Sequence, residues 1–468
     1  MNSNLVNTEI LNKETGLDSL GNTSCISPKD LTTQEPVSTA LDDVNLCTEV
    51  LPVLSDVEPP EIRSPKNSSP LGNFINFGLS GNQTNQRDAT IPIGQSHLSE
   101  VLSPEYLASY HKPIEFNNEN NNVEVLVTGA TGFIASHIVE RLLLRGYKVR
   151  GTIRSLENST YNYLETLPYA KQNLKLVEAN LLNSSIWNEV IKDCQVVIHC
   201  ASPYSMDFND PYVDIINPAV EGTKNVIDAC CLCNDVKTVV LTSSIAAIVG
   251  DYEDGKVYSE ADWNEVSNPL IEPYLYSKAA AERLAHRTID EQRPDLNLIV
   301  VNVGMTIGPS FRTDINQSVQ WIYDMISGGI PTLVDFQTGW IDVRDVAEIH
   351  IRLFETKESH GRYICVQGMH TLQDIARIIK VTKPHLKTPS IVIPTFLAKL
   401  FISLFTSKSA ACFLKKTMGR HILISNGKLV SHLSDYKFIS IEESLTDTCT
   451  DLQNKFKIQS SLFGFLRS

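Results

Sequence analysis

The chain of 468 residues lacks several features that define common protein classes. It has no uninterrupted run of about 20 apolar residues, so we expect no transmembrane span. The first residues, MNSNLVNTEILNKETG, contain no basic segment followed by an apolar one, which argues against a secretory signal. Lys and Arg number 40 against 54 Asp and Glu, so no basic surface for nucleic acid is expected.

The ten cysteines do not form a paired framework. Cys230 and Cys233 give one C-x-x-C motif within NVIDACCLCND, but no second pair completes a zinc site. We therefore expect buried, reduced thiols, no metal site and a cytoplasmic location.

Residues 1–122 differ in composition from the rest. They hold 16 acidic and six basic residues, no Trp and only five Phe or Tyr. A segment with so few large apolar side chains cannot offset the entropy cost of ordering, so we expect it to be mostly disordered. A short docked helix over residues 97–110 is the alternative for that stretch.

From residue 123 onward, apolar strand patterns alternate with helical ones. The predicted strands are 123–128, 148–153, 174–179, 196–201, 238–244 and 296–303. This alternation predicts an α/β domain over 123–468, built on a Rossmann-type, doubly wound parallel sheet. We expect a cofactor-binding core over about 123–303 and a smaller substrate-binding part formed mainly by 304–340 and 366–440. Ligands should bind at the carboxyl ends of the strands.

The first strand–helix turn reads Thr128-Gly129-Ala130-Thr131-Gly132-Phe133-Ile134-Ala135. Gly129 permits a tight turn, Gly132 lets backbone N–H groups approach a pyrophosphate, and Ala135 lets the helix pack closely on the sheet. We therefore predict a dinucleotide site whose contacts include Thr128, Gly129, Thr131, Gly132, Phe133 and Ile134.

The end of the second predicted strand, Arg150 to Ser155, indicates which dinucleotide binds. An NAD site normally has an acidic residue there, whereas this chain has Arg154. A guanidinium suits the 2′-phosphate of NADP(H), and Ser155 can add a hydrogen bond. We predict preference for NADP(H), with NAD(H) as the alternative and Arg150 as a less favoured second contact.

Tyr274 and Lys278 form a Y-x-x-x-K motif that places both side chains on one helix face. The pKa of a free phenol is about 10, and a neighbouring ammonium should lower it. Tyr274 can then exchange a proton with a substrate oxygen, while Ser244, at the end of the fifth strand, stabilises that oxygen. Lys278 can also hold the nicotinamide ribose.

Residues 123 to about 356 resemble the extended short-chain dehydrogenase/reductase family of the NAD-dependent epimerase/dehydratase type. The likeness is greatest to dihydroflavonol-reductase-like and cinnamoyl-CoA-reductase-like carbonyl reductases. It is carried by the segments VTGATGFIASHIVERLLLRGYKVRGTIRS, VIHCASP, NPAVEGTKNVIDAC, VVLTSS, YLYSK and WIDVRDVAEIH. The longer cinnamoyl-CoA reductase signature around the tyrosine is absent, which disfavours CoA thioesters as substrates.

The resemblance implies further contacts. Ala201 and Ser202 would flank the cofactor, Val303 and Gly304 would lie by the nicotinamide, and Asn180 with Leu181 would lie by the adenine, where the family usually has Asp in place of Asn180. The residues expected to border the substrate are Pro203, Tyr204, Met206, Ile245 and Met305. These are largely apolar, so we expect a small-molecule carbonyl or alcohol substrate of apolar or aromatic character.

Residues 391–405, IVIPTFLAKLFISLF, form the most apolar run of the chain. We interpret it as a buried or pocket-covering helix, with membrane-surface contact or a dimer face as alternatives. Two other functions remain open at this stage. One is a membrane-associated enzyme resembling 3β-hydroxysteroid dehydrogenases, and the other is a non-catalytic NADP-binding redox sensor. The sequence does not define the oligomeric state.

Overall fold

The computed structural model describes residues 114–458 except 158–160, 203–207 and 405–407. The predicted helix at 97–110 and nearly all of the extension predicted to be disordered lie outside the described residues. Of the extension, residues 114–122 are described, and they include the short helix η1 (Asn118–Asn122). The Phe116 and Tyr169 rings lie 4.8 Å apart and Asn117 N donates to Arg145 O at 3.2 Å, so packing begins before residue 123.

Seven parallel strands form the main sheet, in the order β10-β7-β5-β4-β1-β2-β3. The strands are β1 (Glu124–Thr128), β2 (Lys148–Ile153), β3 (Leu174–Glu178), β4 (Val196–His199), β5 (Thr238–Ser244), β7 (Asn297–Val303) and β10 (Gly361–Cys365). The six predicted strands are present, and the Rossmann-type sheet is confirmed. The seventh strand, β10, was not predicted.

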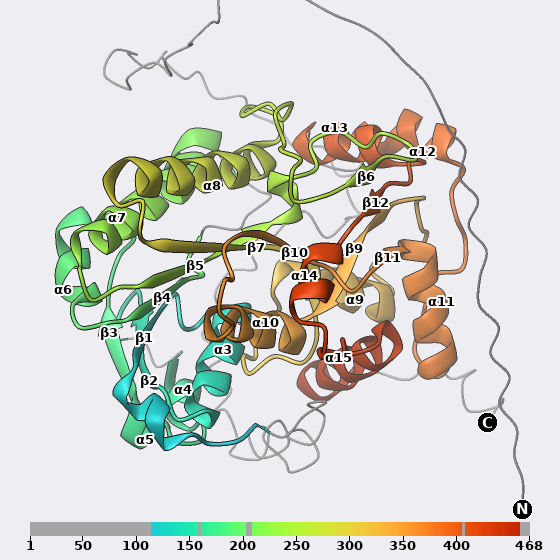
Figure 1. The fold of residues 1–468 in the computed structure, drawn as a ribbon. Helices are drawn as coiled ribbons and strands as arrows, with labels where there is room; N and C mark the ends of the chain where they lie inside the picture. Colours follow the sequence, from blue (N-terminus) through green and yellow to red (C-terminus); the bar gives the residue numbers. More distant parts are fainter. Residues whose placement is uncertain (1–113, 158–160, 203–207, 405–407, 459–468) are drawn as a thin grey trace, which may run out of the picture. The chain divides into compact units, whose positions relative to one another are not determined.

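Helices cover both faces of this sheet (Figure 1). On one face α3 (Phe133–Leu144) lies beside α10 (Val343–Glu355), and on the other α7 (Asn217–Leu232) lies beside α8 (Pro273–Gln292). Side chains of β1 pack on both faces of the sheet. Val125 and Val127 belong to the buried apolar cluster on one face, and Leu126 belongs to the cluster on the other face. An unbroken apolar strand is typical of a parallel sheet buried on both sides.

Short helices lie in the connections between the strands and longer helices of this layer. They are α4 (Asn162–Glu165), α5 (Ala170–Asn173), η3 (Ser184–Ile186), α6 (Trp187–Ile191), η4 (Tyr212–Ile216) and η5 (Ile245–Ala247).

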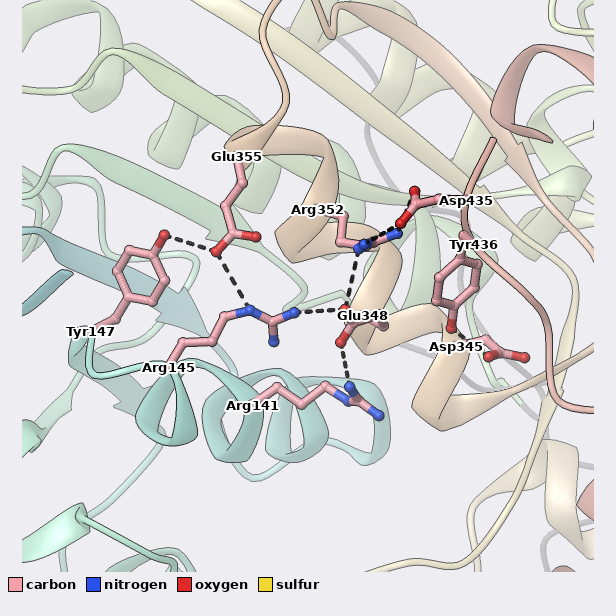
Figure 2. A network of polar contacts seen from close by, with 9 residues as sticks. All are labelled: Arg141, Arg145, Tyr147, Asp345, Glu348, Arg352, Glu355, Asp435 and Tyr436. Carbon is pink, nitrogen blue, oxygen red and sulfur yellow. Dashed lines mark hydrogen bonds and ion pairs between the residues drawn. The ribbon is translucent and has the colours of Figure 1, made fainter. Parts of the chain in front are cut away.

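Ion pairs join α3 to α10 (Figure 2). Glu348 accepts from Arg141 and, at 2.6 Å, from Arg145, while Tyr147 OH donates to Glu355 at 2.9 Å. Burial would raise the pKa of Glu348, but the guanidinium groups of Arg141 and Arg145 outweigh it and hold that pKa below its ordinary value. The carboxylate therefore stays charged and connects the two helices beneath the sheet.

The C-terminal part builds a second layer beside the carboxyl ends of the strands (Figure 1). It contains a three-stranded sheet of β8 (Met305–Ile307), β9 (Gln337–Asp342) and β11 (Gly368–Thr371), and a two-stranded sheet of β6 (Val257–Tyr258) and β12 (Leu423–Ile424). Its helices are α9 (Gln317–Ser327), α11 (Leu372–Thr382), α12 (Thr395–Phe401), η6 (Ile402–Leu404), α13 (Lys408–Thr417), α14 (Gly427–His432) and α15 (Ile441–Phe456). Many of these elements share one apolar cluster, in which Ile322, Ile375 and Leu445 are buried.

Candidate active site

The turn between β1 and α3 requires glycine. Gly129 has a φ of +65°, and a Cβ built there would lie 3.0 Å from the Cβ of Ala201. The turn is held against β2, because Gly129 N donates to Thr152 Oγ1 at 2.9 Å. Gly132 caps α3 without a side-chain hydrogen bond to the helix. The first N–H groups of α3 therefore have no side-chain cap, and Gly132 beside them is exposed and lines the cavity described below, an arrangement that suits a phosphate.

Thr128 ties this turn to β4. Its hydroxyl oxygen accepts from Cys200 N at 3.1 Å and Ala201 N at 3.0 Å, and it bonds His199 Nδ1 at 2.8 Å. Burial, with the Lys278 charge nearby, lowers the pKa of His199 to about 3, so its ring is neutral. The Thr128 side chain is fully buried. The Thr128 hydroxyl therefore joins two strand ends, and its predicted contact with the cofactor stays a prediction.

The two arginines of β2 and its carboxyl end have different surroundings. Arg154 is exposed, two residues beyond Thr152, which contacts the glycine turn. Arg150 is buried, forms an ion pair with Glu124 at 2.5 Å and donates to the carbonyls of Val190 and Lys192. The prediction of Arg150 as a less favoured second contact to a 2′-phosphate is therefore wrong, because burial and these partners hold its guanidinium inside the fold.

Asn180 and Leu181 follow β3, at the predicted adenine end. Asn180 is exposed, and its Oδ1 accepts from Leu182 N at 3.0 Å. Leu181 packs so closely on Gly222 that a Cβ there would lie 3.0 Å from the Leu181 Cβ. Asn180 thus shapes its own turn and retains one amide oxygen lone pair and its NH₂ group for an adenine.

Tyr274 and Lys278 lie one turn apart near the start of α8, and both line a cavity of about 420 Å³. Lys278 Nζ is 5.6 Å from the centroid of the Tyr274 ring and donates to Ser202 Oγ at 3.1 Å. Burial lowers the pKa of Lys278 to about 8. The ammonium therefore lies near both Ser202, after β4, and the Tyr274 ring, and the catalytic role of the pair stays a prediction.

Ser244 ends β5 at the wall of the same cavity. Its Oγ accepts a hydrogen bond from Ala246 N at 3.1 Å. Because that bond uses an oxygen lone pair, the hydroxyl proton can be donated toward a substrate oxygen.

A buried polar cluster lies behind these residues. Glu282, one turn beyond Lys278, accepts from Ser243 Oγ, from Asn302 Nδ2 at 2.8 Å and from Arg362 Nε at 2.5 Å. The Glu282 side chain is 0% exposed and that of Arg362 is 7% exposed. The cluster connects α8, β5, β7 and β10, so the elements that carry Tyr274 and Ser244 share one rigid support.

The cavity brings together most of the predicted site. Residues from the predictions that line it are Gly129, Gly132, Phe133, Ile134, Ser202, Ser244, Ile245, Tyr274, Lys278, Val303, Gly304 and Met305. Packing requires glycine at residue 304, since a Cβ there would lie 2.6 Å from Gly339 O. Predicted cofactor residues outside the lining are Thr128, Thr131, Arg154, Asn180, Leu181 and Ala201. Pro203, Tyr204 and Met206 lie outside the described residues.

Several lining residues were missed by sequence reasoning. They come from the loop after β5 and from the C-terminal layer and include Tyr252, Asn316, Trp321, Phe336 and Phe413. Only Asn316 had a local signal, because Asn before a helical pattern is typical of an N-cap, and its side chain accepts from Ser318 N at 3.0 Å. With Ile245, Val249 and Met305, the aromatic rings make this part of the cavity lining largely apolar.

Comparisons with known proteins agree with this geometry. The model of the NAD dependent epimerase/dehydratase family matches residues 125–366, which are 242 of the 468 residues, and the chain belongs to this family. Among curated relatives, the cinnamoyl-CoA reductase CAD2 of Medicago truncatula is 35% identical over 274 residues, covering 57% of this chain and 82% of the relative. A dihydroflavonol 4-reductase of Gerbera hybrida is 32% identical over 284 residues, covering 59% of this chain and 76% of the relative.

Among solved structures, the yeast methylglyoxal/isovaleraldehyde reductase Gre2, complexed with NADPH, is similar to this chain with a TM-score of 0.60. The identity is 26%, and the alignment covers 71% of this chain and 98% of the yeast protein. The predicted family resemblance is confirmed.

Proposed function

We propose that the protein is an NADPH-dependent oxidoreductase that interconverts an aldehyde or ketone and the corresponding alcohol. The observation that carries the proposal is the convergence of Tyr274, Lys278 and Ser244 on one cavity that begins at the glycine turn. The relatives named above are reductases, and one solved neighbour holds NADPH.

The residues present fit a dinucleotide. The uncapped start of α3 and the positive φ of Gly129 leave backbone space and donors for a pyrophosphate. Arg154 is an exposed cation at the end of β2, and its guanidinium would pair with a 2′-phosphate. Lys278 and Gly304 border the cavity where a nicotinamide would lie. We therefore propose the same division as from sequence, with the cofactor core at about 123–303 and the substrate part mainly at 304–340 and 366–440.

A bound nicotinamide supplies the hydride that converts the carbonyl carbon to the alcohol carbon. The chain's own groups act on the oxygen. Tyr274 donates its phenolic proton to that oxygen during reduction and takes it back during oxidation. The Lys278 ammonium, 5.6 Å from the ring centroid, stabilises the phenolate left behind. Ser244 donates a hydrogen bond that holds the oxygen and stabilises its developing negative charge.

The lining favours one substrate class. Trp321, Phe336 and Phe413 face the cavity together with Met305 and Ile245, whereas its polar lining includes hydroxyl and amide groups such as those of Thr338 and Asn316. We propose an apolar or aromatic carbonyl compound, because a phosphorylated sugar would require cationic partners at this end.

One screen tests the proposal. NADPH oxidation is followed at a fixed protein concentration with aromatic aldehydes, α-dicarbonyls and sterol ketones. Turnover that saturates with at least one apolar carbonyl supports an oxidoreductase. NADPH binding without oxidation across the whole panel would contradict the catalytic proposal and favour a non-catalytic NADP-binding sensor.

A further inference from the structure

The C-terminal layer carries an exposed apolar surface, here named the α12 face. It consists of Ile391, Val392, Phe396, Leu400, Phe401 and Leu404. Phe396 is 71% exposed, Leu400 67% and Leu404 74%. Residues 391–405 were interpreted as a buried or pocket-covering helix, and burial is wrong for these six side chains. Six exposed large apolar side chains within residues 391–404 exceed the single, scattered apolar groups of an ordinary surface, so we treat this face as a candidate binding site.

The spacing shows that the exposure belongs to the helix itself. Phe396, Leu400 and Leu404 recur every four residues, so they form one stripe along α12 and η6. On the opposite side Ala398 and Ile402 are 5% and 3% exposed and pack in the C-terminal cluster. The segment is therefore apolar on both sides. A helix that is apolar all round is expected to have apolar surroundings on both sides.

The segment that carries this face is basic. Residues 375–434 contain ten Lys or Arg and no Asp or Glu, in a chain whose net charge is −14. Lys415 Nζ donates to Ser403 Oγ at 2.6 Å, which holds an ammonium next to exposed Leu404, and Lys399 is carried by α12 itself. Lys416 is excluded from this set because it pairs with Asp251 and Glu272 from other elements.

Apolar side chains with neighbouring ammonium groups match an anionic lipid surface. The apolar groups enter the acyl boundary and the lysines stay at the phosphate level. A symmetric contact between two copies would instead bring two basic segments together. No helix in the described part of the chain is long and apolar enough to cross a bilayer. Helix α12 has seven residues after Pro394, a length that suits a helix lying on a bilayer surface rather than one crossing it.

We propose that the α12 face binds the surface of an anionic phospholipid bilayer. The face is connected to the cavity through one neighbouring helix, since η6 packs on α13 and Phe413 of α13 lines the cavity. Bilayer contact would thus hold the cavity close to apolar compounds dissolved in the lipid. The binding claim stands without the proposed oxidoreductase activity, because it rests on exposure and charge alone.

Flotation of the full-length protein with vesicles tests the proposal. One vesicle set is phosphatidylcholine alone and the other contains phosphatidylserine as well. We expect binding to the anionic vesicles, weakened by high salt, and at least about a tenfold loss of binding in the Phe396→Gln/Leu400→Gln variant. The matched control is Leu232→Gln at the end of α7, a 72% exposed leucine far from α12 in Figure 1, which should bind like the wild type.

Three results would overturn the proposal. They are failure of the wild type to float with anionic vesicles, equal loss in the Leu232→Gln control, and sedimentation of the wild type as a dimer that the double variant dissociates. A salt titration of the wild type needs no variant, so misfolding cannot obscure the answer. NADPH oxidation with a water-soluble carbonyl should be equal in wild type and double variant, which separates failure here from failure of the proposed function.

Discussion

Arg362 Nε donates to Glu282 Oε1 at 2.5 Å, and Glu282 lies one turn beyond Lys278 on α8. Arg362 also donates to the carbonyls of Glu260 and Asp262, and its guanidinium lies 3.8 Å from the Trp263 ring centroid. A buried charge is tolerated only where partners of this kind replace water. Helix α8, which carries Tyr274 and Lys278, is therefore fixed to β10, the strand at the edge of the main sheet.

Breaking this pair should destabilise the fold. In Glu282→Gln the Arg362 charge stays buried without its carboxylate, and we expect a loss of about 3–5 kcal/mol in the free energy of unfolding, measured by urea denaturation. The control is Glu265→Gln, which breaks the exposed Arg283–Glu265 pair at 2.9 Å. That change should cost no more than about 1 kcal/mol. Equal effects of the two substitutions would contradict the role of the buried pair.

Arg154→Ala tests the cofactor preference. If the guanidinium binds the 2′-phosphate, its loss should raise the KM for NADPH by about tenfold to a hundredfold and leave the KM for NADH nearly unchanged. Lys148→Ala, at the other end of β2, is the matched removal of an exposed cation and should change neither value. A parallel rise in both KM values after Arg154→Ala would assign this residue a structural role instead.

Gly129→Ala tests the turn. The residue would adopt a φ of +65° with its Cβ 3.0 Å from that of Ala201, so the turn must shift. We expect NADPH affinity, measured by fluorescence titration, to fall at least about tenfold. The control is Gly255→Ala, at a similar φ of +76° but with no atom within 4 Å of the added Cβ. It introduces similar backbone strain without a close contact and should leave NADPH affinity unchanged. Unchanged NADPH affinity in Gly129→Ala would contradict the site.

The sequence predicted the parts of the molecule that are encoded locally. The strand patterns, the glycine turn and the Tyr274–Lys278 spacing each depend on residues a few positions apart. The structure confirms the strands, and Gly129, Tyr274 and Lys278 line one cavity. Arg150 was less clear, because a charged residue within a strand pattern does not reveal the Glu124 carboxylate that neutralises it.

Other features depend on contacts between distant segments. Trp321, Phe336 and Phe413 meet at the cavity only after the C-terminal layer has folded, and no spacing connects them. Strand β10 was missed because its pairing with β7 follows nearly 60 residues of intervening chain, from Val303 to Gly361. The exposure of Phe396 and Leu400 was also hidden, since apolarity alone does not tell a buried helix from one that faces outward.

The pH dependence of reduction should reflect Lys278. Burial lowers its pKa to about 8, so the ammonium is present below that pH and is lost above it. We expect kcat/KM for carbonyl reduction to fall as pH rises through about 8, because the phenolate of Tyr274 then loses its stabilising charge. In Lys278→Arg the cation persists to higher pH, so the fall should move upward. An identical profile in that variant would mean that another group controls the rate.

The substitution Tyr274→Phe tests the central claim most directly, with Tyr276→Phe on the same helix as its control. NADPH oxidation with a carbonyl found in the screen and NADPH binding by fluorescence are measured on the same samples. Tyr274→Phe should lower kcat at least about a hundredfold with NADPH affinity unchanged, while Tyr276→Phe retains turnover. Undiminished turnover in Tyr274→Phe would contradict the assignment of its phenol as the proton donor.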